Sequence, residues 1–95
     1  MYIVVSWDIS AVGQQWIEIN QQMLNCLQNF QHTRPVNTFY IVGVASEQQR
    51  QQIFDCFSNV RQSTNVSVEF VVSPIYTETN WLGATEENPI WNYPL

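Results

Sequence analysis

Residues 2–10 read YIVVSWDIS, and this stretch decides the fold class. Five of its first six residues are apolar or aromatic and several are β-branched, which predicts a buried strand over residues 2–8. The predicted strand ends on a carboxylate, because Asp8 follows Trp7 directly. The role of Asp8 is therefore the first question: it could serve catalysis, hold a metal ion or only form part of a turn.

An amphipathic helix is predicted after this strand, over residues 14–30, with a turn at residues 10–13 between them. Apolar residues recur at steps of three and four, and polar residues follow the same steps on the other side. The apolar stripe consists of Trp16, Ile19, Met23, Leu27 and Phe30.

Residues 31–36 are ambiguous, since Pro35 confines any strand there to the edge of a sheet. Residues 38–44 predict a clear strand. A serine at position 46 and a glutamine three residues later form a capping box, so a second helix is predicted to begin at Ser46. Residues 66–73 predict the last strand.

The order strand, helix, edge strand, strand, helix, strand predicts an α+β protein. We expect a ferredoxin-like βαββαβ sandwich, in which two helices cover one face of an antiparallel sheet. Residues 1–95 make one domain of modest size. Residues 80–95 contain two prolines and six large apolar residues, so we expect an extended C-terminal tail that docks on protein.

Side chains alternate between the two faces of a strand, which predicts two apolar faces. The face under the helices is expected to hold Ile3, Val5, Trp7, Phe39 and Ile41. The face away from the helices is expected to hold Tyr2, Val4, Tyr40, Val42, Val44 and Val71. A face with this much apolar surface predicts a homodimer, since a two-fold axis packs the patch against the same patch of a second copy. Asp8 lies on the same face and could approach its copy across that axis.

The net charge of the chain limits the kinds of molecule that it can bind. The formal net charge is −5, and the basic residues are Arg34, Arg50 and Arg61, with no lysine. Strong nonspecific binding to DNA or RNA is not expected, because affinity for phosphates comes largely from Lys and Arg. We assign the four tryptophans to core and dimer packing rather than to base stacking, because no basic residues are interleaved with them.

Cys26 and Cys56 each lie inside a helical pattern, far apart in the sequence. We interpret them as separate buried thiols in a reducing compartment. No CxxC motif or His/Cys cluster predicts a zinc site. No cationic leader or long apolar run is present, so we expect a cytoplasmic protein without a membrane segment.

The opening nine residues, MYIVVSWDI, resemble those of the small CRISPR-associated ferredoxin-fold proteins, the dimeric subunit of the spacer-acquisition complex. Those proteins begin with an apolar strand that ends Tyr-Asp-Ile or Tyr-Asp-Leu. The resemblance is closest to a SinR-like branch, distinct from the helix-turn-helix regulator of that name. Three further stretches are similar to that branch: GQQW at 13–16, NTFYIV at 37–42, and WLG at 81–83 with Trp91.

The resemblance implies a homodimer whose tail can add to the partner's sheet. In members with nuclease activity, the acid that ends the first strand is the proposed metal ligand, and Asp8 matches it. Asp8 is therefore the candidate catalytic and metal-binding residue, with Mg²⁺ or Mn²⁺ as the cofactor. Two features depart from the family: Trp7 replaces its usual Tyr, and basic residues are scarce.

Asp8 also has a structural interpretation, in which its carboxylate accepts hydrogen bonds from the turn at residues 10–13. His32 has no acid or cysteine beside it and is interpreted as an edge-strand residue. Two functions stay open. One is a non-catalytic homodimeric interaction or scaffold protein of a defence-related system, with a protein partner. The other is a metal-dependent nuclease that acts on RNA or DNA through Asp8 of both chains.

Overall fold

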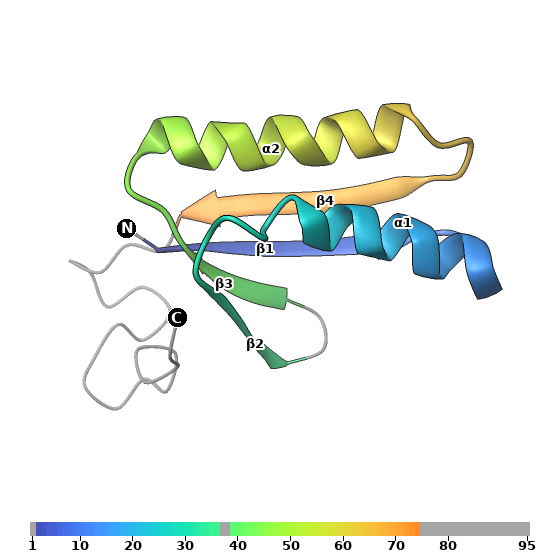
Figure 1. The fold of residues 1–95 in the computed structure, drawn as a ribbon, viewed down its shortest axis with the longest axis horizontal. Helices are drawn as coiled ribbons and strands as arrows, with labels where there is room; N and C mark the ends of the chain where they lie inside the picture. Colours follow the sequence, from blue (N-terminus) through green and yellow to red (C-terminus); the bar gives the residue numbers. More distant parts are fainter. Residues whose placement is uncertain (1, 37–38, 75–95) are drawn as a thin grey trace.

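The structure is a computed structural model that describes residues 2–36 and 39–74, so the predicted docking tail at residues 80–95 lies outside the described residues. The described part is an α+β fold with a four-stranded antiparallel sheet and two helices (Figure 1). Neither described helix is long and apolar enough to cross a membrane. The elements are β1 (Tyr2–Ile9), α1 (Gly13–Asn25), β2 (His32–Val36), β3 (Phe39–Gly43), α2 (Glu47–Gln62) and β4 (Val68–Pro74).

The strand order in the sheet is β2-β3-β1-β4, so the apolar opening strand is central. β1 pairs with β3 on one side and along most of its length with β4 on the other. β2 lies at the edge, where the missing N–H of Pro35 costs least, and its register with β3 shifts between Thr33 and Val36. The prediction of an edge strand before the second clear strand is therefore confirmed.

The first helix ends at Asn25, five residues before the predicted end at position 30. The chain continues in tight turns, in which the Leu27 N–H donates to the Leu24 carbonyl and the Phe30 N–H donates to the Leu27 carbonyl, both at 2.9 Å. Leu27 is still fully buried and Phe30 still packs against the core. The apolar residues therefore keep their helical spacing in the sequence beyond the residue at which α1 ends.

The second helix begins as predicted, with Ser46 as its N-cap. The Ser46 hydroxyl accepts a hydrogen bond from the Gln49 N–H at 3.3 Å. The Gln49 side chain in turn accepts one from the N–H of Ala45 at 2.7 Å, one residue further back than in the standard capping box. The first bond satisfies an N–H of the first helical turn that the helix itself leaves without a partner, and the second holds the residue that precedes the N-cap.

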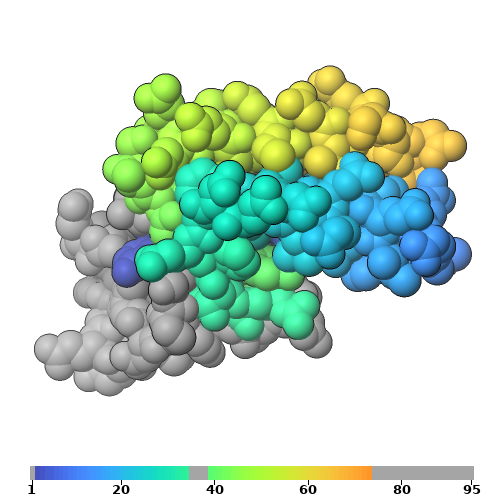
Figure 2. All heavy atoms as spheres, in the orientation of Figure 1, coloured from blue at the N-terminus to red at the C-terminus, as the bar shows by residue number. Residues whose placement is uncertain are grey.

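One cluster of buried side chains joins both helices to one face of the sheet, which we call the core face. Met23 from α1 and Phe57 from α2 are fully buried in it. In Figure 2 the atoms of α1 and α2 form a continuous surface on this side of the molecule. The strands contribute Ile3, Val5, Ile9, Val42 and Val68 to the cluster, and Trp7, Tyr40, Phe70 and Val72 pack against it. Val44, directly after β3, is also in the cluster.

The predicted faces are confirmed for β1 and β4 and wrong for β3. The register places Val42 opposite Ile3 and Tyr40 opposite Val5, and residues opposite each other point to the same face. Tyr40, Val42 and Val44 therefore lie on the core face, while Phe39 and Ile41 lie on the other face. We call that other face the Asp8 face; its residues are Tyr2, Val4, Ser6, Asp8, Phe39, Ile41, Glu69, Val71 and Ser73.

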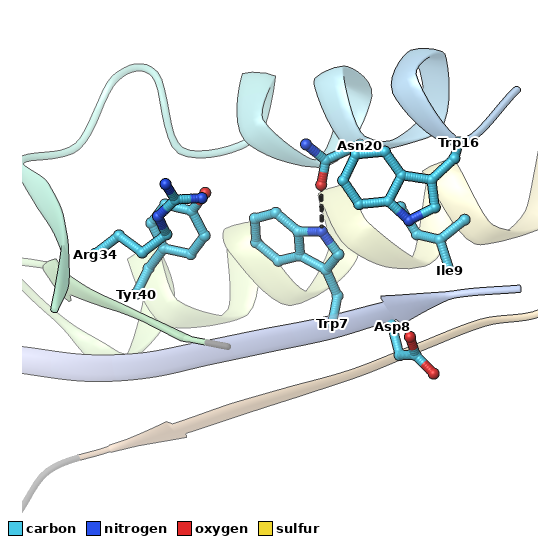
Figure 3. Close-up of a pocket in the computed structure, with 7 residues that line it drawn as sticks. All are labelled: Trp7, Asp8, Ile9, Trp16, Asn20, Arg34 and Tyr40. Carbon is cyan, nitrogen blue, oxygen red and sulfur yellow. Dashed lines mark hydrogen bonds between the residues drawn. The ribbon is translucent and has the colours of Figure 1, made fainter. Parts of the chain in front are cut away.

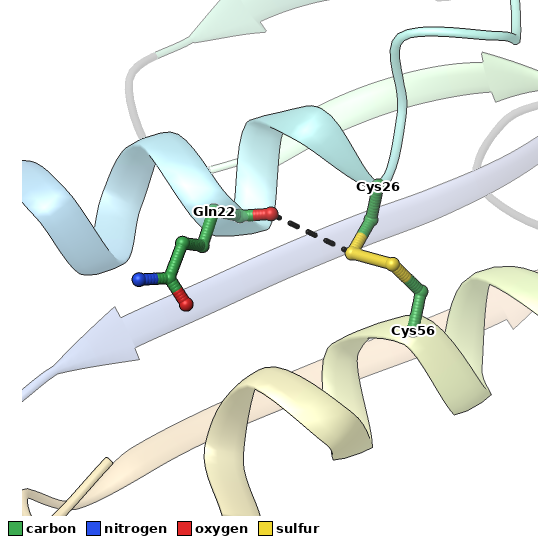
Figure 4. The surroundings of a disulfide bond; sticks show 3 residues. All are labelled: Gln22, Cys26 and Cys56. Carbon is green, nitrogen blue, oxygen red and sulfur yellow. Dashed lines mark hydrogen bonds between the residues drawn. A yellow bond between two sulfur atoms is a disulfide. The ribbon is translucent and has the colours of Figure 1, made fainter. Parts of the chain in front are cut away.

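Cys26 and Cys56 are joined by a disulfide bond, so the interpretation as separate thiols is wrong (Figure 4). Their Cα atoms lie 5.8 Å apart, and the bond ties the end of α1 to α2. The Cys26 sulfur lies 3.6 Å from the Gln22 carbonyl oxygen, a contact and not a hydrogen bond, because the bonded sulfur carries no proton. Disulfides are rare in the cytosol. The cysteines therefore no longer support a cytoplasmic location.

Candidate functional site

Asp8 lies inside β1 and not at its end, because the strand continues to Ile9. It is exposed on the Asp8 face, directly opposite Glu69 of β4. Figure 3 shows its side chain on the opposite side of the sheet from Trp7. The predicted face of Asp8 is thus confirmed, and the structure adds a second carboxylate that the sequence analysis did not associate with it.

The structural interpretation of Asp8 as a tether for the following turn is not supported. The Ser10 N–H donates to the Ser67 carbonyl at 2.9 Å, and the Ala11 N–H donates to the Ile9 carbonyl at 3.0 Å. Backbone carbonyls therefore occupy two of the donors that the Asp8 carboxylate was expected to bind. Within the described part of the chain, that carboxylate has no hydrogen bond.

Asp8 and Glu69 form a pair of carboxylates whose Cβ atoms should be about 5 Å apart, as for residues directly opposite in an antiparallel pair. Such a pair suits a hydrated Mg²⁺ or Mn²⁺, which is commonly held by one or two carboxylates and keeps several waters. No group of three or more His, Cys, Asp or Glu residues gathers in residues 2–36 and 39–74. Residues 2–36 and 39–74 of one chain would therefore supply two ligands, and further ligands would have to come from outside these residues.

The rest of the Asp8 face is mostly apolar. Val71 is 59% exposed and lies opposite Ser6, and Tyr2 is 39% exposed. Val4 and Phe39 are half-buried, and Ile41 is buried although it lies outside the core cluster. The predicted apolar second face is therefore present, with Phe39 and Ile41 in place of Tyr40, Val42 and Val44.

A pocket of about 110 Å³ lies on the other side of the sheet, between α1 and strands β1 to β3 (Figure 3). The Trp7 ring stacks on Tyr40, with centroids 5.0 Å apart and planes 9° from parallel. The Trp7 indole N–H donates to Asn20 Oδ1 at 2.9 Å. The Arg34 guanidinium lies 5.9 Å from the centre of the Tyr40 ring. Trp16, Ile9 and Asp8 complete the lining.

No sequence pattern predicted this pocket, because its residues come from four elements. One signal was present: Asn20 is a polar residue four positions after Trp16, on the apolar stripe of the first helix. A polar side chain on a buried stripe needs a partner, and the indole N–H of Trp7 is that partner.

The other basic residues lie elsewhere. Arg50 pairs with Glu47 on α2, and the Arg61 guanidinium lies 5.0 Å from the centre of the Phe70 ring. His32 Nδ1 lies 2.8 Å from the Phe30 carbonyl oxygen and donates to it, since a carbonyl can only accept. His32 is in the edge strand, as predicted, and has no ion pair with an acid within the described ranges.

Comparisons of the chain with protein-family models, curated proteins and solved structures gave no significant match. Two features of the molecule bear on its function: the acidic and apolar Asp8 face, and the aromatic pocket on the other side of the sheet.

Proposed function

We propose that this chain is a small homodimeric interaction or scaffold protein without catalytic activity. We assign it a ferredoxin-like βαββαβ sandwich with both helices over one face of the sheet. The strand order and the core cluster shared by α1, α2 and the core face support this fold. The resemblance of its opening strand to the CRISPR-associated, SinR-like proteins favours a role in a defence-related system.

The observation that carries this proposal is the apolar character of the Asp8 face. Val71 and Tyr2 leave much apolar surface exposed in one chain, beside Val4 and Phe39. A second copy is the partner that fits, because a two-fold axis places the same patch on both sides of the interface. The net charge of −5 disfavours nucleic acid as the occupant of this face.

Charge also favours one of two ways to pack the faces. Asp8 and Glu69 lie towards one end of β1, and Tyr2 lies at the other. If the two copies of β1 run in opposite directions, each acidic end meets the Tyr2 end of its partner. If they run in the same direction, four carboxylates converge, and without a cation they repel each other. A metal-free scaffold dimer is therefore expected to use the opposite-direction packing.

The experiment is to place a charge on the proposed interface and measure mass by sedimentation at micromolar concentration. Val71→Glu should convert the dimer to monomer, because burial of an unpaired carboxylate costs about 3 kcal/mol or more, which is at least about a hundredfold in the dissociation constant. Ile17→Glu is the matched control, since Ile17 is 55% exposed on α1 against 59% for Val71. The control should remain dimeric. A monomeric wild type, or equal behaviour of the two variants, would exclude this interface.

The second candidate function is a metal-dependent nuclease that acts on RNA or DNA through Asp8 of both chains. The observation in its favour is that Asp8 and Glu69 lie opposite each other, exposed on the proposed dimer face. In the same-direction packing, the two chains would bring four carboxylates together around Mg²⁺ or Mn²⁺.

A melting experiment with and without Mn²⁺ separates the two functions. For the nuclease, Mn²⁺ should stabilise wild type and the control Asp55→Asn, which makes the same charge change on α2, but not Asp8→Asn. Metal-dependent hydrolysis of RNA or DNA should disappear in the same variant. For the scaffold, Mn²⁺ should change none of the three proteins. A metal response that survives in Asp8→Asn would remove Asp8 from the site.

A further inference from the structure

The aromatic pocket on the core side of the sheet has the features of a binding site. Trp16 is 39% exposed, so part of its ring is open to a ligand. Trp7 is fixed by its stacking on Tyr40 and by the hydrogen bond to Asn20. The walls of the pocket are therefore aromatic, and the orientation of Trp7 is already set without a ligand.

The polar groups of the pocket are mainly hydrogen-bond donors. The Trp7 indole N–H occupies Asn20 Oδ1, so the Asn20 amide presents its N–H groups. The Arg34 guanidinium can only donate, and within the described residues it contacts the Tyr40 ring and no carboxylate. Asp8 also borders the pocket, but Figure 3 shows its carboxylate directed away from Trp7, on the other side of β1.

This combination is notable in a chain with a net charge of −5. An arginine among aromatic rings, with no acidic partner in the part of the chain that the structure describes, favours an anion that also carries a flat apolar surface. A guanidinium binds both carboxylate and phosphate through two parallel hydrogen bonds. An aromatic ring gains further from contact with an exposed indole.

We infer that this pocket binds a planar aromatic ring that carries a carboxylate or a phosphate. Figure 3 places Arg34 and Tyr40 to one side of Trp7 and Trp16 to the other, with Asn20 above the Trp7 ring. A ligand that lies across Trp7 therefore has its anionic group at Arg34 and its ring towards Trp16. Apart from Asp8, which borders both, the pocket and the Asp8 face lie on opposite sides of the sheet, so this inference does not depend on the dimer.

The test uses the 95-residue chain and two matched pairs of probes. Indole-3-acetate and its neutral amide differ only in the carboxylate, and adenosine monophosphate and adenosine differ only in the phosphate. Calorimetry up to low millimolar probe should detect binding of at least one anion and clearly weaker binding of its neutral partner. The pair that shows the difference identifies the anionic group.

Variants then assign the residues. Arg34→Gln should weaken binding of the anion by about tenfold or more, the effect of losing a charged hydrogen-bond partner, and should leave the neutral probe unchanged. Trp16→Leu should weaken both members of the pair. Arg50→Gln is the matched control, because that arginine pairs with Glu47 on α2 and lies outside the pocket, so it should bind like wild type.

Two results would overturn the inference. One is that neither anion binds in the millimolar range to a protein that is folded by circular dichroism. The other is that an anion binds but Arg34→Gln and Arg50→Gln weaken it equally, since this outcome means a general charge effect and not a site at Arg34.

Discussion

Reduction of the Cys26–Cys56 disulfide should strongly destabilise the protein. The bond closes a loop between residues 30 positions apart. In the chain-entropy model, release of a loop of this length returns about 3.6 kcal/mol of conformational freedom to the unfolded chain at 25 °C. Small domains have a free energy of unfolding of roughly 5–15 kcal/mol, so this one bond is a large part of the total.

The assay is thermal unfolding followed by circular dichroism, with and without a phosphine reductant. For a domain of this size, the loss corresponds to a fall in the melting temperature of roughly 15–30 °C. Cys56→Ala is the control: it cannot form the bond, so its melting temperature should already be low and should not respond to reductant. This comparison separates the cross-link from the small loss of packing in the variant.

The reasoning fails if wild type melts at the same temperature in both conditions. Thiol titration of the unreduced, denatured protein then decides why. Two titratable thiols would mean that the bond does not form in the sample. No titratable thiol, with no change in melting temperature, would mean that the entropy argument is wrong for this fold.

Two further substitutions test how the helices begin. Gly13 has a φ of +63° at the start of α1, so Gly13→Ala should lower the free energy of unfolding by about 1 kcal/mol, although no atom lies within 4 Å of the added Cβ. Denaturant unfolding measures this loss, and an unchanged stability would contradict the conformational argument. Ser46→Ala removes the acceptor for the Gln49 N–H and should also cost about 1 kcal/mol, whereas Ser58→Ala, inside α2, serves as the control.

Local patterns predicted those parts of the fold that neighbouring residues determine. The alternation in residues 2–8 placed Asp8 on the correct face, because the bulkier alternating set, Ile3, Val5 and Trp7, is the one that lies under the helices. β3 reads FYIVG, with no charged or strongly polar residue, so both phases look equally apolar in the sequence. Only its pairing with β1 sets which side chains face the helices.

Features that depend on packing between elements could not be predicted in the same way. Cys26 and Cys56 face each other only after α1 and α2 have packed side by side, and their spacing in the sequence gives no sign of it. The aromatic pocket requires Trp7, Asn20, Arg34 and Tyr40 to come together from four elements. The sequence therefore predicted the face on which Asp8 lies. It did not predict that Cys26 pairs with Cys56, or that the four pocket residues meet.

The Asp8–Glu69 pair explains why a metal response, rather than stability alone, must decide between the two functions. Like charges directly opposite each other in a sheet cost about 0.2–1 kcal/mol, and Asp8→Asn relieves that repulsion within a single chain. The variant should therefore be neutral or slightly more stable whether or not a dimer brings two Asp8 side chains together. A domain whose free energy of unfolding is roughly 5–15 kcal/mol tolerates this cost. The presence of the Asp8–Glu69 pair therefore does not by itself imply a bound cation. Only a gain from Mn²⁺ that Asp8→Asn abolishes would identify a metal site, and without it the apolar surface of the same face supports the scaffold.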